Sequence, residues 1–166
     1  MPLDITVWSA LWFLPFALPI CIYVCWSDMR AMRIPNMAVL ALTGVFLVIG
    51  LIALPLGEYG GRLLQLVIVL LAGIAMNAGG LVGAGDAKFA AAAAPFIHPG
   101  DLVFLMMLFA ATLLAAFAAH RLAKHSPLRR MAPGWDSWET GSDFPMGLAL
   151  GGALAIYLAL GAFFGS

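Results

Sequence analysis

Charged residues are scarce in this chain of 166 residues, and their scarcity excludes an ordinary soluble domain. Only 10% of the residues are Asp, Glu, Lys or Arg, whereas 64% are apolar, and the mean hydropathy is +1.04. A soluble domain is about a quarter charged and about half apolar. Because so few polar residues cannot cover an apolar core, we expect the solvent of this chain to be a lipid bilayer.

Cysteine is also rare, and the sequence contains no C-x-x-C pair. The two cysteines, Cys21 and Cys25, are four positions apart and would share one face of a helix. Two thiols cannot complete a four-ligand zinc site, and no disulfide framework is implied. We interpret them as small buried residues. The histidines, His98, His120 and His125, are scattered, so their spacing does not indicate a metal site.

Basic residues are missing ahead of the first apolar run, so we interpret that run as a retained helix and not as a cleaved signal peptide. Apolar runs fall at about 6–26, 37–55, 63–80, 87–98, 102–121 and 145–164. The fourth run is short and rich in alanine, and its start falls at or inside the GAGD segment, 83–86. Each helical crossing needs about 20 residues. The pattern predicts an all-α polytopic membrane protein of about six transmembrane helices, with residues 1–166 as a single domain.

The distribution of Lys and Arg predicts the orientation in the membrane. If the six runs alternate in direction, Arg62 alone falls on one side. The other side receives Arg30, Arg33, Lys88, Arg121, Lys124, Arg129 and Arg130. Because cytoplasmic loops carry an excess of Lys and Arg, we expect that side to be cytoplasmic and both termini to be outside. We interpret the basic stretch 121–130 as a segment that fixes the orientation of the chain in the membrane, and we expect no nucleic-acid partner.

Two aspartates fall on the predicted cytoplasmic side, next to the ends of apolar runs. Asp28 follows the first run and Asp86 follows the third, and each is followed two positions later by a cation, Arg30 or Lys88. A carboxylate near a helix end in lipid is energetically costly unless it is paired with a cation or reached by water. Its presence there therefore indicates a function. The alternative, that each acid is an ordinary solvated loop residue, stays open at this point.

A pair of carboxylates has a specific chemistry available to it. Two that lie close together share one proton, so one acts as a base and the other as an acid at the same pH. The base would activate a water to attack a peptide carbonyl, and the acid would protonate the carbonyl oxygen. No cofactor is expected, because this chemistry needs none. Gly83 and Gly85 would permit an irregular, strand-like backbone beside Asp86 that could pair with an extended substrate.

The segments around the two aspartates resemble the type IV prepilin peptidase family, membrane aspartic peptidases with a GxGD motif. Its first block, an Asp followed by a basic stretch and Ile-Pro-Asn, reads DMRAMRIPN at 28–36. The second, GxGDxK, reads GAGDAK at 83–88, and a looser third block with a Pro and a Gly reads FPMG at 144–147. The combination covers nearly the whole chain and is far more specific than GxGD alone.

This resemblance implies removal of a short basic leader from prepilins or pseudopilins, just before their apolar segment, at the cytoplasmic face of the bacterial inner membrane. It assigns catalysis to Asp28 and Asp86 without fixing which is the base. Larger members carry an N-terminal region with paired C-x-x-C zinc sites, associated with N-methylation, and the sequence lacks such a region. The chain thus resembles the short, peptidase-only branch of Flp (tight adherence) pili. The implied partners are a prepilin or pseudopilin and membrane lipid.

Other residues near the motifs have two interpretations each. Lys88, Arg30 and Arg33 would bind substrate or influence the neighbouring aspartates, or they would anchor the protein to lipid phosphates. Pro145 would shape a substrate groove or only start a helix. The pair at 35–36 is expected to set a turn and cap the second helix.

Two other functions remain open on the sequence alone. One is a small proton-linked transporter that uses the same acids, although both acids lie toward one face of the membrane. The other is a non-catalytic subunit of a pilus or secretion assembly, in which the aspartates would be dispensable.

Overall fold

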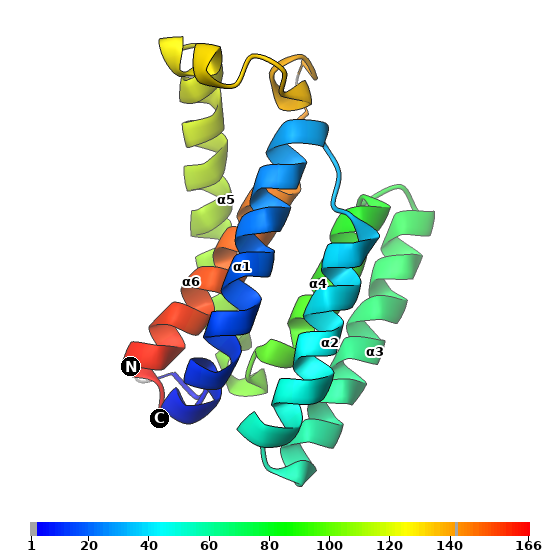
Figure 1. Ribbon diagram of the computed structural model, residues 1–166. Helices are drawn as coiled ribbons and strands as arrows, with labels where there is room; N and C mark the ends of the chain where they lie inside the picture. The colour runs from blue at the N-terminus through cyan, green and yellow to red at the C-terminus, as the bar shows by residue number, and fades with distance from the viewer. Residues whose placement is uncertain (1–2, 142) are drawn as a thin grey trace.

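The computed structural model describes residues 3–141 and 143–166, in which the chain forms six α-helices and no strand (Figure 1). Five helices are long and apolar enough to cross a bilayer. They are α1 (Val7–Ala31), α2 (Asn36–Ala53), α3 (Leu56–Ala78), α5 (Leu102–Lys124) and α6 (Met146–Phe164). The sixth is the short helix α4 (Ala84–Ala93). The prediction of an all-α, multi-pass membrane protein is therefore confirmed.

Helix α4 is shorter than the other five. Its ten residues rise about 15 Å, half of the roughly 30 Å of a hydrocarbon core. As expected, it starts inside the GAGD segment, at Ala84. It ends at Ala93 because the following 3₁₀ turn, η1 (Ala94–Phe96), contains Pro95, which has no backbone N–H to continue the helix. A second turn, η2 (Pro99–Asp101), then leads into α5.

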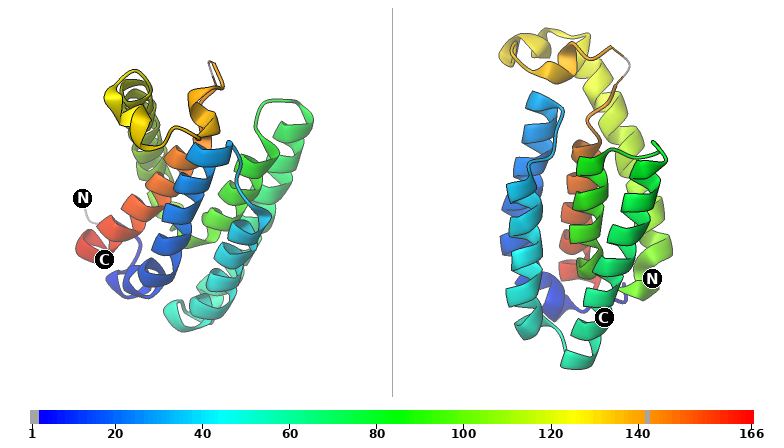
Figure 2. Two further views of the ribbon diagram at one scale, coloured as in Figure 1. Left: turned by 45° about the horizontal axis from the view of Figure 1, so that its top comes forward. Right: turned by 90° about the vertical axis from the view of Figure 1, so that its right-hand side faces the viewer.

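The helices alternate in direction, so the described connections gather at two opposite ends of the bundle (Figures 1 and 2). One end, which we call the basic end, holds the α1–α2 and α3–α4 connections and the segment after α5, with η3 (Pro127–Met131) and η4 (Asp136–Trp138). Seven of the eight Lys and Arg residues lie there or in the adjoining helix turns: Arg30, Arg33, Lys88, Arg121, Lys124, Arg129 and Arg130.

The two termini meet at the opposite end of the bundle, in keeping with the prediction that they lie on one side. The Leu3 N–H donates to the Phe164 carbonyl at 3.0 Å, and the Ser166 N–H donates to the Leu3 carbonyl at 3.0 Å. The remaining basic residue, Arg62, lies within α3 and not in a loop as expected. It is only 4% exposed, and its guanidinium donates to the Ile97 carbonyl.

Helices α1 and α6 make the most extensive helix contact, through residues with small side chains. A Cβ atom added at Gly151 would lie 2.9 Å from both the Cys21 carbonyl oxygen and the Cys25 Sγ atom. Only glycine therefore fits there, as at other close helix contacts in membranes. Cys21 and Cys25 share one face of α1, as predicted, and Asp28 extends the same face by one turn.

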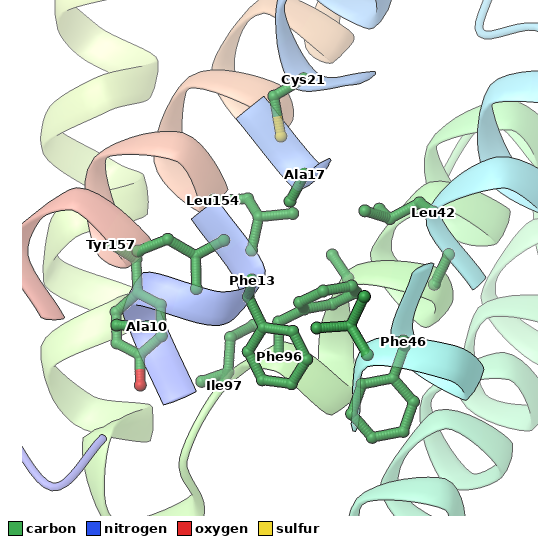
Figure 3. Packing of buried hydrophobic residues seen from close by; sticks show 14 of the residues in the cluster. Ala10, Phe13, Ala17, Cys21, Leu42, Phe46, Phe96, Ile97, Leu154 and Tyr157 are labelled. Carbon is green, nitrogen blue, oxygen red and sulfur yellow. The ribbon is translucent and has the colours of Figure 1, made fainter. Parts of the chain in front are cut away.

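An aromatic cluster connects α1, α2 and η1 (Figure 3). The ring of Phe13 lies 4.9 Å from that of Phe96 and 5.9 Å from that of Phe46, and Phe46 and Phe96 are 5.5 Å apart between centroids. All three side chains are fully buried. The cluster fixes η1, and with it α4, against α1, so the two helices that carry the predicted catalytic aspartates share one core.

Candidate active site

Asp28 lies in the last turn of α1, and not after the helix as the sequence indicated. Its side chain is 5% exposed, and its Oδ2 atom accepts a hydrogen bond from the Gly147 N–H at 2.6 Å. Gly147 is the second residue of α6, where backbone N–H groups have no partner within the helix. The positive end of the helix dipole also points at the carboxylate. The start of α6 thus stabilises a negative charge on Asp28.

The end of α1 turns the chain back over this carboxylate. Met32 has a φ of 49°, in the left-handed region that few residues other than glycine adopt, and its N–H donates to the Asp28 carbonyl. The Ser27 hydroxyl then donates to the Arg33 carbonyl at 3.2 Å. These two bonds close the turn and bring Arg33 to the cavity beside Asp28.

Asp86 is the third residue of α4, and its helix begins at the glycines of the GAGD segment. Gly83 is extended and precedes the helix, and a Cβ atom there would lie 2.6 Å from the Asp86 Oδ2 atom. Glycine is therefore needed at 83 to leave room for the carboxylate. Gly85 lies inside α4. The prediction of a strand-like backbone is therefore wrong at Gly85. Gly83 is extended, but the described residues before α4 form no strand.

Both aspartates line one cavity of about 670 Å³ at the basic end. Seven of the eight residues proposed from the sequence line it: Asp28, Asp86, Gly83, Gly85, Lys88, Arg33 and Pro145. The exception is Arg30, which lies two residues after Asp28 and so points to the opposite side of α1. Its guanidinium carbon lies 5.0 Å above the Trp26 ring, and it lines a neighbouring cavity together with Arg33.

The two carboxyl groups differ in their surroundings. Asp86 lies outside the five candidate spans, and burial, reinforced by the charge of Asp28, raises the pKa of its carboxyl from 3.8 to about 6. Asp28 is buried as well, but it also accepts an N–H group at a helix start, which favours its charged form. The arrangement can therefore hold one proton between the two groups.

Lys88 and Asn36 meet at the rim of the cavity. The Lys88 Nζ atom donates to the Asn36 Oδ1 atom at 3.2 Å and so connects α4 to α2. We expected residues 35–36 to set the turn and cap α2. The turn is there, with the Pro35 carbonyl accepting the Ala38 N–H, but α2 has no side-chain cap. The Asn36 side chain binds Lys88, which a one-dimensional pattern could not indicate.

Pro145 and Gly147 position the start of α6. Pro145 is buried and immediately precedes the helix, one position earlier than the helix-start proline that we considered. A Cβ atom at Gly147 would lie 2.9 Å from the Asp28 Cβ atom, so this position too requires glycine. The role of Gly147 as the amide donor to Asp28 was missed. The FPMG block directly ahead of an apolar run was the available signal, because the first N–H groups of a helix need acceptors.

Further residues line the cavity without having been proposed: Met32, Ile34, Asn36, Ala84, Asp143, Phe144 and Met146. Across residues 3–141 and 143–166, no three His, Cys, Asp or Glu side chains gather as a candidate metal-binding group.

Comparison with known proteins gives a match to a family model. No curated protein and no solved structure matches the chain. The model of the type IV leader peptidase family matches residues 15–120, which is more than half of the chain and includes the segments around Asp28 and Asp86. The chain therefore belongs to the type IV leader peptidase family.

Proposed function

We propose that the chain is an aspartic endopeptidase that removes the leader from prepilins or pseudopilins. Membership of the family makes it a peptidase of the leader-peptidase type, with a prepilin-type substrate in general terms. The observation that supports the aspartic mechanism is that Asp28 and Asp86 line one cavity and that the charge of Asp28 helps to raise the pKa of Asp86. Asp28 and Asp86 are the proposed catalytic residues.

The surroundings of the two carboxyl groups suggest a division of roles. Asp28, whose charged form the Gly147 N–H favours, takes a proton from a water whose oxygen attacks the scissile carbonyl carbon. Asp86 gives its proton to the carbonyl oxygen, which yields a tetrahedral diol. Asp28 then passes its new proton to the leaving nitrogen, while Asp86 recovers a proton from a diol hydroxyl. The C–N bond breaks, and the two carboxyl groups return to their starting states.

The other proposed residues would bind the substrate around this centre. Gly83, Gly85, Lys88, Arg33 and Pro145 line the cavity with the two acids, whereas Arg30 would act from the neighbouring cavity. We place the basic end in the cytoplasm of a bacterium, at the inner membrane, because seven of the eight Lys and Arg residues lie there. The chain would act as a single peptidase domain, on prepilins of the Flp type.

The test is cleavage of a co-expressed Flp-type prepilin, followed as a gel shift. Asp28→Asn and Asp86→Asn keep the size of each side chain but remove the titratable group, so each should abolish leader removal while membrane insertion is unchanged. The matched control is Asp136→Asn, because Asp136 is exposed and lies outside the cavity. Undiminished cleavage by Asp86→Asn would contradict the mechanism. Restoration of pilus assembly by the double Asn variant would instead support a non-catalytic assembly role.

A further inference from the structure

A second cavity lies between the helices, farther from the basic end than the active-site cavity. It has a volume of about 310 Å³, and its walls include Gln65 of α3, Ala90 and Ala93 of α4, Met106 of α5 and Ala153 of α6. We call it the lateral groove. Apart from Gln65, all the side chains that line it are apolar.

The groove exists because α5 packs against only part of the bundle. Among the described residues, α6 is the main helical partner of α5, and His120 is the only fully buried residue on α5. The side of α5 that carries Met106 therefore faces α3 and α4 across a space that side chains do not fill. Met106 is 53% exposed. The groove is therefore open to the outside of the helix bundle.

Helix α4 connects the groove to the active-site cavity. Asp86, Ala90 and Ala93 are spaced by four and seven residues, so they lie along one face of α4. Asp86 lines the cavity, and the two alanines line the groove. The rise from Asp86 to Ala93 is about 10 Å. A polypeptide whose scissile bond lies at Asp86, and which continues along this face, therefore enters the groove.

The lining favours a helix over a lipid chain as the occupant. Small residues such as Ala90, Ala93 and Ala153 allow a second helix to approach closely. The Gln65 Nε2 atom donates to the Ile97 carbonyl at 3.4 Å, but the buried Gln65 Oε1 atom has no hydrogen-bond partner in the described part of the chain. An unpaired buried acceptor is unfavourable. Because Gln65 as a whole is only half-buried, its amide group can turn toward a hydroxyl or amide side chain on a docking helix, whereas an acyl chain offers no such partner.

We propose that the lateral groove docks the apolar membrane segment of the protein substrate, on the side of the scissile bond that stays in the bilayer. This inference rests on the proposed peptidase function. A helix with its side chains is about 10–12 Å wide, so the groove receives the side chains of one helix face and not the whole helix. The face that enters carries small residues, with a hydroxyl or amide group opposite Gln65.

Two adjacent methionines provide a matched pair for the test. Met106 lines the groove and Met107 does not, although they are 53% and 61% exposed. A photo-reactive benzoylphenylalanine is placed at one position or the other in the Asp86→Asn background, which keeps the co-expressed prepilin uncleaved. We expect crosslinks to the apolar segment of the prepilin from position 106 and none above background from position 107.

The size of the groove is tested separately, in the chain with both aspartates intact. Ala90→Leu reduces the groove, so it should raise the KM for prepilin about tenfold with little change in kcat, since it removes binding and not chemistry. The same exchange at the exposed Ala111, which lies one turn beyond Met107 on α5, should leave both constants unchanged. Thermal unfolding of both variants shows whether they fold like the parent.

The outcomes separate the docking inference from the peptidase proposal. If the parent chain does not cleave prepilin, the proposed function fails. If the parent cleaves but positions 106 and 107 crosslink equally, or position 106 crosslinks only to lipid or to a second copy of the chain, the docking inference is wrong. An unchanged KM for a well-folded Ala90→Leu variant would also overturn it.

Discussion

The N–H of Gly147 donates to the Asp28 carboxylate at 2.6 Å, across a sequence separation of 119 residues. The bond connects the last turn of α1 to the first turn of α6. It depends on the absence of a side chain, because a Cβ atom at Gly147 would come within 3.1 Å of three side-chain atoms of Asp28. A glycine at the start of α6 therefore determines the position of an acid on α1 and favours its charged form.

Gly147→Ala should reduce cleavage at least tenfold, because the added methyl displaces the Asp28 carboxylate from its amide donor. A misplacement of about 1 Å near the reacting groups is enough for a loss on the order of a hundredfold. The measurement is the initial rate of leader removal by purified enzyme in detergent. Gly61→Ala on α3 is the matched control, since a Cβ atom there meets nothing within 4 Å. Equal rates for the two variants would show that the Gly147 contact is dispensable.

Tyr157→Phe should destabilise the protein without slowing the peptidase at saturating substrate. The Tyr157 hydroxyl donates to the buried Asp101 carboxylate at 2.7 Å and accepts the His98 N–H at 3.0 Å. Losing a hydrogen bond to a buried charge costs about 1.5–3 kcal/mol. This site lies near the termini, away from the basic end, so kcat should stay within about twofold of the parent. Thermal unfolding in detergent measures the loss, and Tyr23→Phe, at an exposed position, is the control. An unchanged midpoint would mean that the bond contributes little.

The sequence was a sound guide wherever the bilayer imposes the pattern. Of the six apolar runs expected to cross the membrane, five coincide with helices that are long enough to do so, and their alternation placed Asp28 and Asp86 at one end of the bundle. The exact ends of the helices were harder to predict from the sequence. Asp28 was expected after α1 but lies within it, because the helix continues to Ala31 through polar residues that a hydropathy pattern does not count.

Contacts between distant segments could not be derived from spacing. Nothing in the order of residues indicates that Asn36 binds Lys88. The contact of Arg30 with the Trp26 ring is different, because these residues are four apart and the contact follows once α1 is known to continue past Asp28. The length of α4 was similarly hidden, since an Ala-rich run fits both a span and a half-length helix until Pro95 is recognised as its limit. The lateral groove follows from that short helix and from the position of α5, which are properties of the packed bundle.

Lys88→Gln distinguishes substrate binding from lipid anchoring. Lys88 lines the cavity and bonds to Asn36, so its loss should raise the KM for prepilin several-fold and leave membrane insertion intact. Arg130→Gln is the matched control, because Arg130 is exposed and lines neither this cavity nor its neighbour. If both exchanges reduce insertion to the same extent and neither changes KM, the two residues act as anchors to lipid phosphates.

The pH profile of cleavage should decline above about pH 6, because the pKa of the Asp86 carboxyl is raised to about 6 by burial and by the charge of Asp28. As the pH rises through that value, Asp86 loses the proton that the carbonyl oxygen must receive, and the pair becomes doubly charged. The form with one proton therefore decreases about tenfold for each further pH unit, and kcat/KM should follow it, since this ratio reports the free enzyme.

The measurement is kcat/KM for prepilin in detergent between about pH 5 and pH 8. Lys88→Gln serves as a control, because removing a cation at the rim should not eliminate the decline. A profile that stays flat across this range would show that the proton on Asp86 is not needed, and it would reverse or remove the role proposed for that residue.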